Sequence, residues 1–103
     1  MADEPSQSGN SDERQRTLAL LDDQHTFPGT FRFRVVIRPG LRAPVVQAVA
    51  AAVQEDAIGR VHERVSRNGN YLSLRLEVEV ASAEQVLEVY EVLQRVDGVL
   101  AVL

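Results

Sequence analysis

One stretch constrains the fold of this chain more than any other: the ten residues 71–80, which follow a turn-forming sequence at 66–70. Every second residue in the stretch is apolar, and tyrosine, serine, arginine and glutamate hold the positions between. Strict alternation of this length is typical of a long β-strand with one buried and one solvated face. The residues predicted to be buried are Leu72, Leu74, Leu76, Val78 and Val80.

The segment before this strand is predicted to be its hairpin partner. Asn68 and Gly69 are typical of a two-residue type I′ turn, in which both central residues have positive φ. Glu63 then falls opposite an apolar residue, and this misfit indicates that the strand at 60–67 lies at a sheet edge. The other cross-strand pairs expected from this register are Val65 with Leu72, Val61 with Leu76 and Arg60 with Glu77.

Four further elements follow from their patterns. Residues 31–37 alternate in the manner of a half-buried strand, and residues 99–103 are wholly apolar, which favours a short paired strand. An apolar stripe at helical spacing runs from Pro44 until Gly59, which is expected to stop the helix. Ser82 begins a second helix with a capping box.

The order strand, helix, strand, strand, helix, strand predicts an α+β fold. This order of elements is the one found in a ferredoxin-like βαββαβ sandwich, with a four-stranded antiparallel sheet of order 4-1-3-2 and two helices on one face. Residues 27–103 would form this domain, preceded by an acidic, largely disordered tail at 1–26. Within the tail, the leucines at 18–21 either close a short helix or dock as a turn against the domain.

Composition narrows the classes of function. The net charge of −4 resides in residues 1–26, so the predicted domain is neutral, which disfavours nucleic-acid binding. Cysteine is absent, and the two histidines, His25 and His62, have no spacing typical of a metal site or a catalytic triad. We therefore expect no enzyme, no metal and no cofactor. Because neither a secretion signal nor a membrane span is present in the sequence, a cytoplasmic protein is expected.

Several segments together resemble the YbeD-like family of small bacterial proteins of unknown function. The resemblance covers nearly all of residues 18–103, and its most specific part is the Gly-Asn-Tyr-x-Ser motif at 69–73. It implies a ferredoxin-like fold related to the ACT regulatory domains of amino-acid metabolism, and no particular activity. The chain departs from the family where the first strand ends, because Gly40 stands later than the family's glycine. The other resembling pieces are Leu20–Pro28, Phe31–Val36, Tyr90–Glu91, and Asp97–Val99 with Val102 and Leu103.

Arginines supply the candidate binding sites. All 11 basic residues are arginine, and several fall on the predicted open face of the sheet. RNA-recognition modules stack bases on aromatic residues of that face, but only Tyr71 is available here, at a strand end. Leu100 and Val102 are expected to add an apolar strip beside these arginines if they point to the same face. The predicted interaction face is Arg32, Arg34, Val36, Arg75, Leu100 and Val102.

A second candidate site is the loop before the first helix of the predicted domain. Arg38 and Arg42 flank Gly40 there, and helix N-termini favour anions. The sequence thus leaves two functions open. The first is a small regulatory or protein-interaction module that uses the open face and strand edges to bind a protein partner or a second copy of itself. The alternative is an ACT-like sensor for a small anionic metabolite at the Arg38–Arg42 loop.

Overall fold

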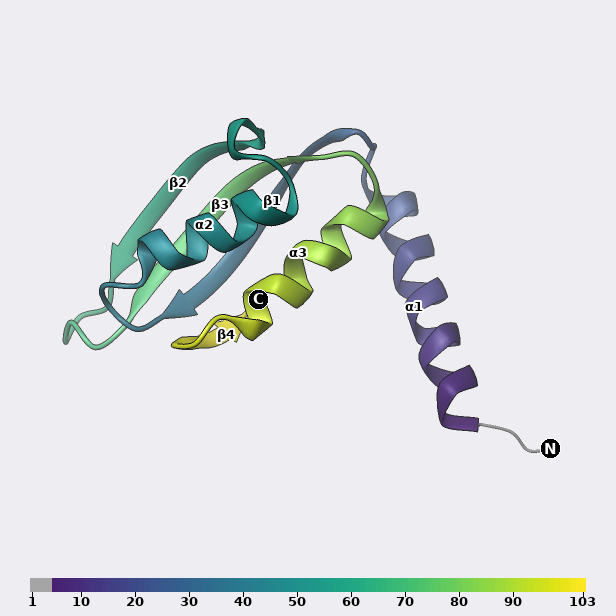
Figure 1. Cartoon of the computed structure of the whole chain (residues 1–103), viewed down its shortest axis with the longest axis horizontal. Coiled ribbons are helices and arrows are strands. Elements are labelled where there is room, and N and C mark those ends of the chain that lie inside the picture. Colours follow the sequence, from purple (N-terminus) through teal and green to yellow (C-terminus); the bar gives the residue numbers. More distant parts are fainter. Residues whose placement is uncertain (1–4) are drawn as a thin grey trace.

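The computed structural model describes the backbone of residues 5–103 and the side chains of residues 11–103. Three helices, a short 3-10 turn and four strands follow one another along this part of the chain (Figure 1). Their bounds are α1 (Pro5–Gln24), β1 (Gly29–Ile37), α2 (Arg42–Ala52), η1 (Glu55–Ala57), β2 (Ile58–Val65), β3 (Leu72–Val80), α3 (Ala83–Arg95) and β4 (Val99–Val102).

The four strands form one antiparallel sheet in the order β2-β3-β1-β4, with α2 and α3 packed on the same face (Figure 1). This is the predicted order 4-1-3-2 listed in reverse, so the ferredoxin-like fold is confirmed. The two central strands are the longest, and the alternation of β3 predicted its boundaries to within one residue. Their buried sides supply most of the core, which includes Phe33, Val35, Leu74 and Leu76 at 0% exposure.

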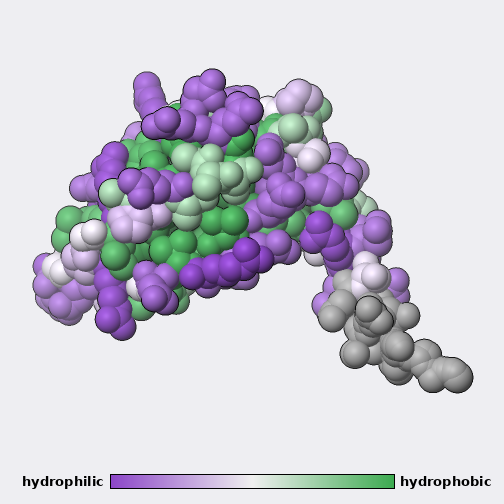
Figure 2. Space-filling model, viewed as in Figure 1, coloured by the Kyte–Doolittle hydropathy of each residue, from purple (hydrophilic) through white to green (hydrophobic). Residues whose placement is uncertain are grey.

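The side of the molecule that carries the helices is partly apolar. Figure 2 shows apolar side chains over α2 and toward β4, bordered by hydrophilic residues. The α2 sequence explains this, because nine of its eleven residues are alanine, valine or proline and only Arg42 is charged. The opposite side of the sheet, which carries no helix, is called the open face below.

The hairpin between β2 and β3 has the predicted register but a different turn. Val61 lies opposite Leu76 and Val65 opposite Leu72, as expected. The predicted type I′ turn is wrong, because it requires a positive φ at both Asn68 and Gly69. Gly69 has a φ of 76°, but Asn68 does not have a positive φ, since every described residue that has one is a glycine. The N–H of Gly69 donates to the carbonyl of Ser66, and Ser66 pairs with Tyr71. A four-residue loop, 67–70, therefore connects the strands without changing the pairing.

The first helix of the domain is shorter than predicted. It begins two residues before Pro44 and ends at Ala52, and Gly59 lies inside β2 instead of stopping the helix. Ile58 pairs with Val78 as a strand residue, and a register irregularity follows between Ile58 and Val61. This irregularity also removes the predicted pairing of Arg60 with Glu77 from the regular ladder.

The capped start of α3 is confirmed. The Oγ of Ser82 accepts a hydrogen bond from the N–H of Gln85 at 3.2 Å. The Gln85 side chain reaches back one residue further than a standard capping box, and its Oε1 accepts from the N–H of Ala81 at 2.7 Å. The first bond satisfies a donor that the first turn of a helix leaves free, and the second satisfies the N–H of the residue before the N-cap.

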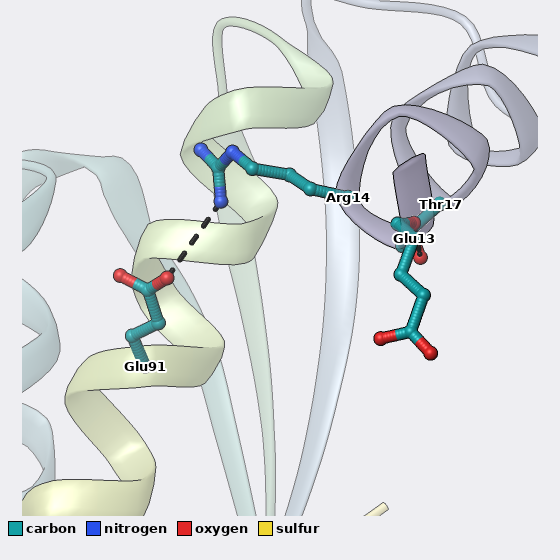
Figure 3. Close-up of polar contacts among 4 residues, drawn as sticks. All are labelled: Glu13, Arg14, Thr17 and Glu91. Atoms are coloured by element: carbon teal, nitrogen blue, oxygen red, sulfur yellow. Dashed lines mark hydrogen bonds and ion pairs between the residues drawn. The ribbon is translucent and has the colours of Figure 1, made fainter. Parts of the chain in front are cut away.

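Helix α1 occupies much of the segment that was expected to be disordered. Residues 5–24 are helical, which differs from the expectation for residues 5–17, while residues 1–4 lie outside the described part of the chain. Leu21 packs against the core, and Arg14 forms an ion pair with Glu91 of α3 at 3.7 Å (Figure 3). The helix otherwise stands beyond α3, at the opposite end of the molecule from the β2–β3 hairpin (Figure 1). That residues 27–103 form a domain of their own stays a prediction.

Candidate functional site

Two arginines meet at the centre of the open face. Arg34 of β1 lies directly opposite Arg75 of β3, and both side chains are exposed. The neighbouring residue pair Phe33 and Leu76 faces the core, so the arginines point the other way. Like charges directly opposite each other in a sheet are destabilising.

The pairing geometry of β1 and β3 brings these two residues close. The carbonyl of Arg34 accepts a hydrogen bond from the N–H of Leu103, so the backbone of Arg34 points toward β4 and away from β3. Arg34 and Arg75 therefore form a non-hydrogen-bonded pair, the kind in which opposed Cα atoms lie about 4.5 Å apart and side chains are nearest. The two guanidinium groups are held on adjacent strands with no carboxylate between them: within residues 11–103, no ion pair involves either arginine.

Strand β2 adds a histidine and a third arginine beside this pair. His62 lies opposite Arg75, and Arg64 lies opposite Ser73. Together with Leu103, these residues line a shallow hollow of about 490 Å³. Glu63 reaches the rim of the hollow but its carboxylate is engaged elsewhere, with Arg42. We call the group Arg34, His62, Arg64 and Arg75 the basic centre.

The arginine nearest the basic centre along β1 is already neutralised. Arg32 lies opposite Glu77, with Nε and Oε2 3.7 Å apart. One step further, the Thr30 hydroxyl donates to Glu79. The open face thus has two zones: a paired one at Thr30–Arg32 and an unpaired cationic one at the basic centre.

The predicted apolar strip is only partly present. Val102 lies opposite Val35 and packs against the core, so it faces the helices, contrary to expectation. Val36 is half-buried and lies opposite Ala101, while Leu100 is 44% exposed. Leu103, which the sequence analysis did not select, lies beside the basic centre and is 64% exposed. The run 99–103 has no polar residue, so alternation could not show which residues face the core.

The loop before α2 has a different arrangement from the open face. Arg42 begins the helix and its Nη1 lies 2.7 Å from Oε1 of Glu63, which resolves the predicted misfit of that glutamate. Gly40 has a positive φ of 89°, and Arg38 is exposed. Pro44 has no N–H to offer an anion. The three residues of the predicted anion site are thus adjacent, but Glu63 already supplies a negative charge to one of them.

An aromatic cluster covers the start of β1. Phe31 contacts His25, Phe33 and Tyr90, with ring centroids 4.9, 4.8 and 6.3 Å apart respectively. Burial raises the pKa of the Tyr90 phenol above its ordinary value, because the charged form is poorly solvated there. No group of three metal-binding side chains occurs among the described residues. Nor does the described part of the chain contain a helix long and apolar enough to cross a membrane.

The fold and these sites can be compared with known proteins. The sequence profile of a family described as "Protein of unknown function (DUF493)" matches residues 22–103. This chain belongs to the DUF493 family. The resemblance to YbeD-like proteins is thereby confirmed, and the matched region starts within α1.

One relative supports the assignment to the DUF493 family, and one solved structure supports the fold. The UPF0250 protein PM1928 of Pasteurella multocida (strain Pm70) is 36% identical over 87 residues, covering 82% of this chain and 97% of that protein. The solution structure of protein HP0495 from H. pylori superposes with a TM-score of 0.65, at 15% identity, covering 81% of this chain and 92% of that one. At that identity the second likeness concerns the fold alone.

Proposed function

We propose that this DUF493 protein is a non-catalytic interaction module that binds an acidic segment of a protein partner at the basic centre. The observation that carries the proposal is the cross-strand pair Arg34–Arg75, two exposed like charges held together by the central strands. A free protein gains nothing from that arrangement, because the repulsion opposes folding. A carboxylate-bearing partner would relieve it.

Geometry supports a carboxylate as the complementary group. Arginine presents a planar fork of donors that matches a carboxylate with two parallel hydrogen bonds. Two arginines on neighbouring strands, with Arg64 and His62 beside them, would accommodate more than one such group. The exposed Leu103 at the edge of the hollow offers an apolar contact next to the charges. Arginines at the centre of an interface are among the residues that carry most of the binding energy in many complexes.

The alternative, a sensor for a small anion at the Arg38–Arg42 loop, has weaker geometric support. Arg42 would have to leave Glu63, and the pocket would keep that carboxylate as a neighbour. A sensor of this kind gains thermal stability when a small carboxylate or phosphate is added, by mass action on the folded state. The interaction module we propose shows no gain beyond the one that sodium chloride of the same ionic strength produces by screening.

The direct test is a titration of the protein with a peptide of about ten glutamates, followed by NMR. We expect shifts of backbone amides around Arg34, Arg75 and His62, and a loss of affinity of at least tenfold in Arg75→Glu. Arg95→Glu is the matched control, because it makes the same change of net charge at an exposed position on α3. Equal binding by the two variants, or shifts confined to the loop at 38–42, would contradict the proposal.

A second arm separates acidic proteins from nucleic acids. A single-stranded oligonucleotide of matched charge serves as the probe. Among the described residues, the open face offers bases only His62 and, just before β3, Tyr71, so there is little for them to stack on. We therefore expect weaker binding than to the peptide. Tighter binding of the oligonucleotide would reassign the basic centre to nucleic acid.

A further inference from the structure

Strand β1 is paired along only part of one of its edges. On the β3 side it is paired over its whole length, from Gly29 to Ile37. On the β4 side its partners extend only from Val35 to Ile37, with one further bond from the Leu103 N–H to the Arg34 carbonyl. The first half of β1 therefore has a neighbour on one side alone.

The backbone groups left over can be identified. In a strand, the N–H and C=O of one residue point to the same side, and alternate residues point to alternate sides. Since Arg34 points toward β4, Arg32 and Thr30 do as well. No backbone hydrogen bond to either residue is found on that side within the described part of the chain. We call the segment Thr30–Arg32, with these two donors and two acceptors, the free edge.

A hollow accompanies the free edge. It has a volume of about 390 Å³ and is lined by His25, Thr30, Phe31, Arg32 and Glu77. Two of these, His25 and Phe31, belong to the aromatic cluster on the helix-covered side, whereas Arg32 and Glu77 belong to the open face. The hollow therefore gives access to the edge and to side chains of both faces.

From this arrangement we infer that the free edge binds an extended segment of a partner protein, which adds a strand to the sheet in line with β4. The segment would have alternating apolar and acidic residues. Side chains on one face of the added strand would meet Phe31 and His25. Those on the other face would meet Arg34, which forms no ion pair among the described residues, and Arg32, which would exchange Glu77 for a carboxylate of the segment. Addition of a strand to an exposed edge is a recurrent mode of peptide recognition, with affinity from the main chain and selectivity from alternate side chains.

The inference rests on the proposed function, because it supplies the mode by which an acidic segment would reach the basic centre. Arg34 belongs to both sites: its side chain is in the basic centre and its backbone continues the row of the free edge. The other possible occupant is a second copy of this chain. The unneutralised Arg34 side chains of the two copies would then be brought closer together, so charge disfavours that outcome.

A matched pair of variants isolates the backbone donor. Thr30→Pro and Thr30→Ala both remove the hydroxyl that bonds Glu79, but only proline removes the N–H at the edge. Because this N–H points away from β3, the proline variant keeps every hydrogen bond between β1 and β3. Circular dichroism and thermal melting of both variants establish that they fold.

The probe is a random library of peptides of about 12 residues, selected on the wild-type protein. We expect enriched peptides with acidic residues at every second position, bound at least tenfold more weakly by Thr30→Pro than by Thr30→Ala. In the complex, hydrogen exchange at the Thr30 and Arg32 amides should slow at least tenfold, while the Phe31 and Phe33 amides, already paired with β3, change little. The inference is overturned if the library yields no such peptides, or if the two variants bind them equally. It is also overturned if the protein self-associates with increasing concentration in a way that requires the Thr30 N–H.

The failures of the two proposals can be told apart. If the peptides bind, depend on Arg75 and ignore the Thr30 backbone, the basic centre stands and strand addition fails. If they depend on the Thr30 backbone and bind Arg75→Glu as tightly as the wild type, strand addition stands and the basic centre fails.

Discussion

At the scale of single residues, Gly69 fixes the form of the β2–β3 hairpin. Its φ of 76° lies in a region that residues with a Cβ rarely adopt, and β-branched residues least of all. The Gly69 N–H also closes the turn on the carbonyl of Ser66. Asn68, the residue that suggested a type I′ turn, has a negative φ, so the identity of two residues did not determine the turn type.

Replacing Gly69 by valine should lower the free energy of unfolding by more than about 1 kcal/mol, because the side chain resists positive φ. Asn70→Val is the control, since it puts the same side chain in the same loop at a residue with negative φ. Urea denaturation followed by circular dichroism measures both. Equal midpoints for the two variants would show that the loop does not hold Gly69 in this conformation.

Tyr90 predicts how stability depends on pH. Its raised pKa means that the folded state keeps the phenol proton where the unfolded state loses it. The contribution of Tyr90 to the free energy of unfolding is therefore fully present below about pH 10, the ordinary pKa of tyrosine. It is lost as the pH rises through the pKa of Tyr90 in the folded state. The chain has no lysine, so few other groups titrate there.

Tyr90→Phe should accordingly reduce the loss of stability between about pH 9 and pH 11, measured by urea denaturation at each pH. Tyr71→Phe, at an exposed position, is the matched control for the loss of a tyrosine hydroxyl. A steep loss that is identical in Tyr90→Phe and the wild type would contradict the burial of this phenol.

At the scale of elements, predictability follows the clarity of the hydrophobic pattern. The alternation of apolar and polar residues in β1 and β3 was sufficient to predict which residues face the core. In β3 it was also sufficient to predict the register of the hairpin with β2. The apolar run in β4 contains no alternation, and a register shift between Val36 and Ile37 sets which of its residues face the core. Helix α1 is mostly polar, and its visible links to the body are local: Leu21 on the core and Arg14 with Glu91. Isolated contacts of that kind do not require apolar residues at helical spacing, so the sequence pattern did not predict the helix.

The role of α1 can be measured by truncation. Deleting residues 1–17 should change the free energy of unfolding by no more than about 1 kcal/mol, because it removes an exposed ion pair and the described side chains at 11–17 are all exposed. Leu21→Ala in the full chain should cost more, about 1–2 kcal/mol, since this half-buried side chain packs against the core. The reverse order of the two effects would mean that the first turns of α1 contribute structure that these contacts do not account for.

At the scale of the whole molecule, charge and apolar surface are distributed unequally between the two faces of the sheet. Of the candidate site, the sequence was sufficient to place Arg32, Arg34 and Arg75 on the open face, because parity along β1 and β3 determines it. It could not show that Arg32 is paired with Glu77, that Arg42 is paired with Glu63, or that Leu103 lies beside the basic centre. Those contacts join residues that are distant in the sequence, and they depend on the conformations of flexible side chains and on the position of the last residues.

The central claim is that the basic centre is an unneutralised charge cluster whose repulsion the free protein tolerates. Urea denaturation of Arg75→Glu in low salt tests it most directly, with Arg95→Glu as the control. Exchanging the like-charge pair for an opposite-charge pair should raise the free energy of unfolding by about 0.5–1 kcal/mol. Added salt should stabilise the wild type by screening its repulsion and should shrink the difference between the two proteins. Arg75→Glu should be more stable than the wild type, whereas Arg95→Glu should not be, because Arg95 lies in the last turn of α3, where a negative charge is unfavourable. An Arg75→Glu variant no more stable than the wild type would contradict the central claim.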